Sequence, residues 1–510
     1  MSKLKKVALI IVIVVVVIVV GLAIIIPMLL DVDRYRPQVA AQIQEETGKP
    51  VQIGRLALTI LPQVAIRVDD FSLGNPAGFP PGDFVKAKKI YAVVDASALF
   101  HHQVSITSLE LDDLTLNMLE DTHGKWNFEN PPSKAASPPP DAKGGGGASF
   151  TLGIISKLTV ARGEFRAANL LASGVPGPAL MEVHGAAIDL HDVNLNGLAS
   201  ASLRDLPLQP SQPSFASGWF STIAYAADTQ GTPVAQGTIK ADALKFGPIS
   251  VSKMSSKFRL FPKQAYFDDL ALKCYEGGAT GNLSLDFGGA NLAYGVDAKI
   301  KGVNVAEFLN AFPQARGMLT GTLDAAAKMK GLVSNSPDPL AGVTGDGQAS
   351  IRNGKMPSLQ LGENLRTLAK MASVGPANGD PSSFSSLSTD FRIADSRLSS
   401  NKIALVGNGV NVDGSGSMTM AGEGSLDYQG DASLAASGSN PLTSVLGGLA
   451  GAKTENGKLI FPFTVGGTFN KPKFALKGSP GGPAAAPVNA VQQDVNSVRG
   501  LAGMFKKKKQ

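Results

Sequence analysis

The longest apolar run of the chain extends from Val7 to Leu30 and contains 24 residues without a charge. At about 1.5 Å per residue, a helix of this length reaches roughly 36 Å, enough to cross a hydrocarbon core of about 30 Å. Lysines precede the run and aspartates follow it, so the positive-inside bias places the N-terminus in the cytoplasm. A signal peptide has a shorter apolar region and a small-residue cleavage site, which Ile24–Leu30 lacks. The pattern therefore favours an uncleaved transmembrane anchor over a signal peptide.

A short amphipathic helix is predicted directly after this anchor. Tyr35, Val39 and Ile43 recur at four-residue steps, which places them on one apolar face. Asp33 is positioned to cap the first turn, and Gly48 ends the pattern, as glycine commonly does at helix C-termini. We therefore expect one helix between the anchor and the rest of the chain.

From residue 51 onward the hydrophobic period changes from four to two, the period of half-buried strands. The clearest alternation runs from Leu319 to Met329, with mostly polar residues between the apolar ones. Similar segments are residues 51–60, 64–68, 109–118, 283–287, 296–300 and 459–465. In the last of these, Pro462 indicates a sheet edge or a strand start. Apart from short helices at residues 305–309 and 364–371, the chain is predicted to be mainly β.

Pairs of acidic residues accompany several of these segments. We interpret Asp112–Asp113 as a bulge or bend within one strand. The pairs Asp69–Asp70 and Asp268–Asp269 are interpreted as turn residues and guards at strand edges, not as acid/base dyads.

Segments rich in Pro, Gly, Ser or Ala divide the chain into regions. The predicted organisation is a cytoplasmic stub (1–6), the transmembrane anchor (7–30), an N-terminal helix with strands (31–130), a flexible linker (131–149), a central β-groove region (150–386) with a loop at about 207–236, a C-terminal β region (387–478) and a Pro/Gly-rich tail (479–510).

The tail ends in Lys506, Lys507, Lys508 and Lys509, and apolar residues precede them at three- and four-residue steps. Two interpretations stay open for this segment. It is either a soluble basic tail or an amphipathic helix whose lysines contact anionic lipid at a membrane surface.

Charge argues against nucleic acid as a partner. The net charge is +6, but seven positive charges lie at the two tips of the chain. The remainder carries 40 Lys and Arg against 41 Asp and Glu, with no basic stripe that could displace counterions from phosphates. Glycine is abundant (57 of 510 residues) and aromatic residues are few (6%), which suits many strands and turns.

Motifs that carry catalysis or bind a cofactor are absent from the sequence. His101 and His102 are neighbours, which on a strand point to opposite faces, so they do not form a metal site unless they lie in a turn. The lone Cys274 cannot form an intrachain disulfide. His123–Gly124 predicts a hairpin turn, with Trp126 and Phe128 on one face of the next strand. We expect no enzyme, metal or cofactor here.

Two blocks of the chain resemble the AsmA family of bacterial envelope proteins. The first, more specific block contains Asp31–Pro37, Thr47–Gly54, Phe71–Pro76 and Gly124–Phe128 in that order. The second block contains Leu387–Ile393, Gly414–Gly416, Leu426–Tyr428, Phe463–Phe469 and Lys471–Phe474. The resemblance implies a protein anchored in the bacterial inner membrane, with a periplasmic body and a role in outer-membrane biogenesis. It also implies similarity to chorein-type bridge proteins, in which curved strands form a trough along which lipids move.

The alternation supports such a trough independently. A row of strands that is apolar on one face must close, pair with another sheet or hold an apolar ligand. We therefore predict an elongated, curved, open β-groove of many strands, with one N-terminal transmembrane helix and a few short helices. Its floor would bind acyl chains without specificity, gaining about 25 cal/mol per Å² covered. The residues expected to contact lipid are Leu283, Leu285, Phe287, Leu319, Leu323, Met329, Leu459, Phe461 and Phe463.

The leading hypothesis is a conduit that carries phospholipid from the inner membrane, with an outer-membrane or periplasmic protein as partner at its far end. The alternative is an envelope assembly or scaffold factor that affects outer-membrane protein targeting and insertion through protein contacts at edge strands. An enzyme ranks third.

Overall fold

The computed structural model describes residues 32–61, 63–95, 103–129, 149–150, 154–194, 232–289, 291–333, 338, 340–356, 382–407, 410–435, 453–456, 458–468 and 471–476. The predicted anchor, the helix at 364–371, His101–His102, the basic tail and most of the linker and the long loop lie outside these residues. Within the described segments, none of the helices combines the length and the apolar composition needed to cross a membrane. The chain divides into two compact units, residues 1–270 with 286–290 and residues 271–285 with 291–510.

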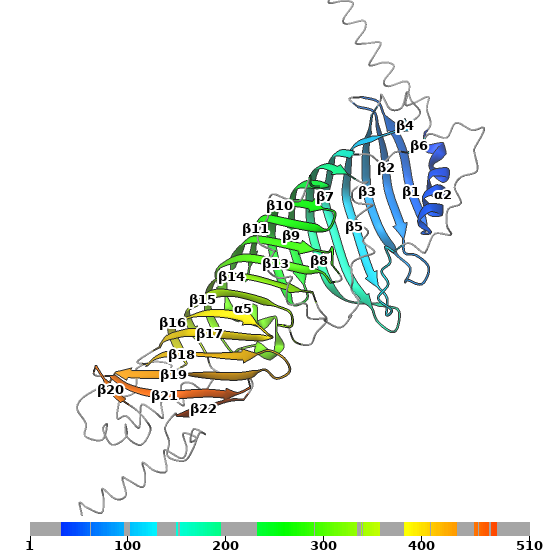
Figure 1. Ribbon diagram of the computed structural model, residues 1–510. Coiled ribbons are helices and arrows are strands. Elements are labelled where there is room, and N and C mark those ends of the chain that lie inside the picture. Colours follow the sequence, from blue (N-terminus) through cyan, green and yellow to red (C-terminus); the bar gives the residue numbers. More distant parts are fainter. Residues whose placement is uncertain are drawn as a thin grey trace, which may run out of the picture. The chain divides into compact units, whose positions relative to one another are not determined.

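The first unit is a sheet whose strands follow one another in chain order (Figure 1). Neighbouring strands are antiparallel, except that β5 (Ile106–Glu120) and β7 (Ile154–Leu170) are parallel. The strands are β1 (Val51–Thr59), β2 (Ala65–Gly74), β3 (Asp83–Val94), β5 (Ile106–Glu120), β7 (Ile154–Leu170), β8 (Pro176–Asn194), β9 (Ala235–Phe246) and β10 (Ile249–Phe261). Two short strands, β4 (Gln103–Val104) and β6 (Ser149–Phe150), form a separate parallel pair.

The second unit is an antiparallel sheet, again in chain order (Figure 1). Its strands are β13 (Ala293–Asn304), β14 (Thr320–Leu332), β15 (Thr344–Lys355), β16 (Ser383–Ala394), β17 (Arg397–Gly407), β18 (Val410–Thr419), β19 (Ser425–Ala435) and β21 (Lys458–Gly467). Both β20 (Lys453–Glu455) and β22 (Pro472–Leu476) pair with β21. The strands β11 (Gln264–Cys274) and β12 (Gly277–Asp286) contain residues of both units.

Helices are few among the described residues. They are the 3-10 helix η1 (Val32–Tyr35), α2 (Arg36–Thr47), α5 (Val305–Asn310) and the 3-10 helix η4 (Pro313–Ala315). The mainly β prediction is confirmed, and α5 matches the helix expected at residues 305–309. The predicted limit between residues 386 and 387 falls inside β16, because pairing with β15 already begins at Ser383.

The helix after the predicted anchor covers the free edge of β1. Asp33 bonds to this strand and does not cap the helix. The Leu56 backbone N–H donates to Asp33 Oδ1 (2.8 Å), and Arg36 Nη1 donates to the Gly54 carbonyl oxygen (2.5 Å). No side chain caps the N-terminus of α2, so the proposed capping role of Asp33 is wrong. Gly48 does end the helix in the left-handed conformation, as predicted.

The predicted apolar face of α2 is largely open. Tyr35 and Val39 are 44% and 37% exposed, whereas Ile43 is half-buried.

Pro462 lies inside β21, not at a strand start. On one side it pairs with Asp431 of β19. On the other side, pairing with β20 stops at Ile460 and pairing with β22 begins at Phe463. The proline therefore occupies a gap in the ladder, where a missing N–H costs no strand-to-strand hydrogen bond.

Cross-strand register aligns the apolar positions of the first unit into rows. One row is Ile66, Ala92, Leu109, Leu158 and Leu190, and the next is Val68, Ile90, Leu111, Val160, Ile188 and Ile239. Since side chains alternate between faces along each strand, one face of this sheet is apolar and the other polar.

Three left-handed residues bend this sheet. Asp70, Asp113 and Arg162 adopt left-handed backbone angles (φ 53°, 52° and 54°) in the middle of β2, β5 and β7. The register with the neighbouring strands continues unchanged past Asp70 and Asp113, whereas it shifts around Arg162, where β7 pairs with β8. Apolar residues three apart, such as Val68 and Phe71, flank the bend in β2. The prediction of a bulge or bend at Asp112–Asp113 is therefore confirmed as a bend.

The other acidic pairs were misassigned. Asp69–Asp70 and Asp268–Asp269 lie within strands β2 and β11, and Asp70 and Asp269 adopt left-handed backbone angles there. Asp tolerates this conformation better than most residues, which explains its use at bends as well as in turns.

The His123–Gly124 turn is confirmed, but no strand follows it. Trp126 forms a single bridge with Glu120, and its ring stacks on Phe128 at 5.5 Å. Between them, the fully buried Asn127 donates to Asn75 Oδ1 and to the Asn117 carbonyl oxygen (both 2.8 Å) and accepts from the Leu119 N–H (3.0 Å). This network joins the turn to β5 and to the connection after β2.

Candidate functional site

The apolar face of the second unit remains half-exposed, whereas its polar face is open to solvent. In β14, Ala326 and Lys328 point to the polar face and are exposed. Ala325 and Ala327 point to the opposite face and are of intermediate exposure. The same contrast recurs along β15, β16 and β19. A sheet packed against a second layer would instead bury its apolar face, so much of this face is left without such a layer among the described residues.

Small side chains form the centre of this face. Register places Ala298 opposite Ala327, Ala327 opposite Gly347, and Ala325 opposite Ala349. These five residues, which we call the furrow, run from β13 across β14 to β15. Because their side chains are short, the face is lowest here, and the furrow runs across the strands.

One side of the furrow is covered by α5. Buried Val305 of this helix packs with Ile351, Phe384 and Leu405 of the sheet. Asn304 caps the helix by accepting from the N–H groups of Ala306 and Glu307 (3.1 and 3.3 Å). The partly buried residues packed against this cluster are Leu309, Leu319, Leu323, Met356, Leu387 and Val412.

The other side is covered by the connection between β14 and β15. Leu340 and Val343 of this connection are buried with Ile393. Met329, Phe391 and Leu398 pack against them. The furrow is therefore flanked by two apolar clusters of larger side chains.

The residues predicted to contact lipid are thus distributed over several places. Leu319 and Leu323 lie together beside α5, and Met329 lies in the opposite cluster. Leu283, Leu285 and Phe287 are half-buried on or just after β12. Phe461 is 2% exposed and Phe463 half-buried on β21, which also contains Leu459. Lys506–Lys509 lie outside the described residues.

Sequence reasoning overlooked the furrow and the apolar rows of the first unit. Alanine and glycine carry a weak hydrophobic signal, so Ala298, Ala325 and Ala327 were predicted only as members of alternating segments, and Gly347 and Ala349 belonged to none of these segments. In the first unit, a signal for the apolar rows was present in the sequence. Apolar and polar residues alternate through Leu109, Leu111, Leu114 and Leu116, and the three-residue step from Leu111 to Leu114 marks the bend at Asp113.

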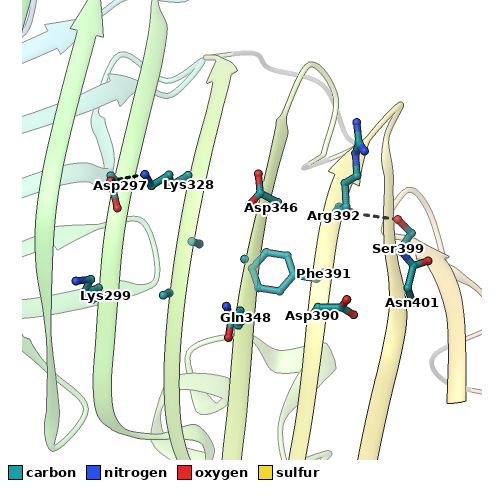
Figure 2. Close-up of a pocket in the computed structure, with 13 residues that line it drawn as sticks. Asp297, Lys299, Lys328, Asp346, Gln348, Asp390, Phe391, Arg392, Ser399 and Asn401 are labelled. Carbon is teal, nitrogen blue, oxygen red and sulfur yellow. Dashed lines mark hydrogen bonds and ion pairs between the residues drawn. The ribbon is translucent and has the colours of Figure 1, made fainter. Parts of the chain in front are cut away.

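The polar face of the second unit contains a hollow of about 490 Å³ (Figure 2). Asp297, Lys328, Asp346 and Arg392 follow one another on neighbouring strands, so their charges alternate. Lys328 pairs with Asp297 at 3.4 Å, and the short Ala326 leaves the space between longer side chains. Opposite charges lie next to one another, which is the arrangement of a solvated, self-neutralising strand face.

The directions of the pKa shifts agree with these two faces. Backbone hydrogen bonding from Lys402 (2.9 Å) lowers the pKa of Asp390 on the polar side. Burial raises the pKa of Tyr294 and of Tyr428, which belong to the apolar face. Burial also raises the pKa of the half-buried Cys274 thiol. Nowhere in the described ranges do three or more His, Cys, Asp or Glu residues gather as metal ligands would.

Comparison with known protein families identifies part of the chain. Residues 1–143 match the model of the AsmA family, which confirms the resemblance seen in the first block. No curated protein and no solved structure matches the chain.

Proposed function

We propose, because residues 1–143 match the model of the AsmA family, that the chain is a non-enzymatic envelope protein that carries phospholipid along its apolar β-faces. The observation that carries this proposal is the half-exposed apolar face of the second unit, with its furrow of small residues. A monomeric soluble protein rarely leaves a large contiguous apolar surface uncovered unless it binds something there.

Phospholipid acyl chains fit this surface physically. Covering it gains about 25 cal/mol per Å² and needs no directional contact, so chains can move along it. The furrow crosses the strands, which is the direction in which a chain would pass from one strand to the next. No bond is made or broken, so the function requires no catalytic group.

The proposed location follows from the anchor and the family resemblance. We place residues 7–30 in the bacterial inner membrane, the N-terminus in the cytoplasm and the body in the periplasm. From there the protein would serve outer-membrane biogenesis, with a periplasmic or outer-membrane protein as partner.

A second candidate, the assembly or scaffold factor, is favoured by one observation. Within the described part of the chain, β22 pairs only with β21, so its other edge is available for strand addition. Lys471, Pro472 and Lys473 are residues that guard such edges, which weakens this alternative.

Lipid analysis of the natively purified full-length protein tests the proposal. Ala325→Arg and Ala327→Arg place a charge in the furrow, whereas Ala326→Arg places it on the exposed polar face of the same strand. Leu319 and Leu323 are less suitable, because their substitution would also break the α5 cluster. We expect the wild type and Ala326→Arg to contain phospholipid by mass spectrometry, and the two furrow variants to contain several-fold less. A wild-type protein that carries no lipid would exclude the conduit.

A further inference from the structure

Several aromatic rings on the apolar faces lie over glycines. In the first unit, a Cβ built on Gly163 would lie 2.9 Å from Cε2 of Phe165. In the second unit, a Cβ built on Gly331 would lie 2.7 Å from the hydroxyl oxygen of Tyr294 and 2.8 Å from its Cζ. Both distances are shorter than real Cβ contacts. Each ring therefore occupies the space that a side chain would need at its glycine.

The same arrangement recurs across neighbouring strands of the second unit. Gly331 is the direct partner of Tyr294, Gly347 of Phe391, and Gly416 of Tyr428. A Cβ on Gly347 would lie 2.5 Å from Cζ of Phe391, and one on Gly416 would lie 2.5 Å from Cδ1 of Tyr428. Gly354 and Phe384 form a further pair of this kind, under α5.

These pairs reduce how far the aromatic side chains stand out from the apolar face of the sheet. Side chains on a strand normally stand roughly perpendicular to the sheet. An aromatic ring opposite glycine can instead lie against the exposed backbone of the neighbouring strand, as in the aromatic rescue of glycine. Gly347 is itself a furrow residue, so the Phe391 ring borders the row Ala298, Ala327 and Gly347, on the side where it also packs against the cluster of Leu340 and Val343.

We infer that the glycine–aromatic pairs keep the apolar faces open to unbranched alkyl chains, and that the glycines are the positioning residues that hold the rings flat. The inference rests on the proposed function and names the ligand class more narrowly. Flat rings and small side chains suit an extended, unbranched chain, whereas an upright ring would stand in its path.

Gly163→Ala and Gly331→Ala are the cleanest tests. At both positions the nearest atoms to an added Cβ belong to side chains, whereas at Gly347 an added Cβ would also meet the Ala326 carbonyl oxygen. Gly466→Ala is the matched control, because a Cβ there would meet only the Leu426 carbonyl oxygen, at 3.8 Å.

Lipid bound per protein is measured by mass spectrometry on full-length protein. We expect Gly163→Ala and Gly331→Ala to lose bound lipid several-fold, and Gly466→Ala to retain it. Removing the displaced ring, with Phe165→Leu or Tyr294→Leu added to the respective alanine variant, should restore the lipid.

Unchanged lipid in the alanine variants overturns the inference and leaves the proposed function standing. Double variants that stay empty also overturn it. A lipid-free wild type overturns both.

A fluorescence measurement does not depend on the glycine variants folding. The chain has two tryptophans, so Tyr294→Trp with Trp126→Phe and Trp219→Phe leaves one reporter over Gly331. Phospholipid brominated on its acyl chains should quench this reporter, because the flat ring would form part of the surface that the alkyl chain contacts. Absence of quenching in protein shown to hold the brominated lipid contradicts the inference.

Discussion

Asp33 accepts a hydrogen bond from the backbone N–H of Leu56 across 2.8 Å, although the two residues belong to different elements. Arg36, one helical turn further, donates to the Gly54 carbonyl oxygen. Together the two side chains occupy polar groups on the outer edge of β1. An exposed strand edge is a template for association with another chain, so this helix protects the edge of the first unit.

Removing both side chains should expose that edge. We expect Asp33→Ala with Arg36→Ala to lower the free energy of unfolding by about 1–3 kcal/mol, because two hydrogen bonds with charged partners are lost. We also expect concentration-dependent association, measured by light scattering after size exclusion. Arg34→Ala is the control, since within the described part of the chain the exposed Arg34 bonds to and stacks on its neighbour Tyr35 and not on β1. A double variant that stays monomeric and unchanged in stability would contradict edge protection.

Asn127 should be the most sensitive polar residue of the family-matched region. Asn127→Leu removes three buried hydrogen bonds and leaves the Leu119 N–H without its acceptor. The expected loss of unfolding free energy is about 2–4 kcal/mol, measured by urea denaturation. His123→Ala in the same turn changes an exposed side chain and should have little effect. Equal stability of the two variants would show that the network is not structural.

At the bend in β2, the effect of replacing Asp70 on stability should depend on whether the new residue tolerates the left-handed backbone conformation. Asp70→Val places a β-branched residue at a φ of 53°, which we expect to cost about 1–2 kcal/mol. Asp70→Gly adopts this conformation without strain and should be nearly neutral. The comparison requires only thermal unfolding of the two variants. If valine is tolerated as well as glycine, the bend does not depend on this residue.

The basic tail offers a test of membrane-surface contact. Replacing Lys506, Lys507, Lys508 and Lys509 with glutamine should weaken binding of the tail peptide to anionic vesicles by about 1 kcal/mol per lysine. Binding should weaken similarly when salt is raised, and neutral vesicles should bind both peptides equally poorly. A glutamine variant that binds anionic vesicles as well as the original peptide would favour the soluble tail.

Sequence periodicity was sufficient for the mainly β fold, because alternation with a period of two depends only on which face of a strand is covered. The segment 319–329 became β14 almost as predicted, and the bend at Asp112–Asp113 was predicted from its acidic pair. The other acidic pairs were misread because Asp favours turns and left-handed bend positions for the same conformational reason. A step of three between apolar residues, as between Val68 and Phe71, indicates that an acidic pair lies at a bend within a strand and not in a turn between strands.

The candidate site was less accessible from sequence. Large apolar residues such as Leu319 and Leu323 carried the strongest hydrophobic signal, but α5 and its neighbours cover them. The accessible centre consists of alanine and glycine, whose role depends on the register of three strands. Register is a long-range property, and a local pattern does not contain it. The hydrogen bonds of Asp33 and Arg36 to β1 were unpredictable for the same reason.

The aligned bends of β2, β5 and β7 also bear on how such chains change in size during evolution. The three left-handed residues lie in one row of the sheet, although β3, between β2 and β5, has none. An insertion within one strand would move its bend out of this row, whereas an added hairpin would leave the row intact. Relatives are therefore expected to differ in length by whole hairpins more readily than by changes within a strand.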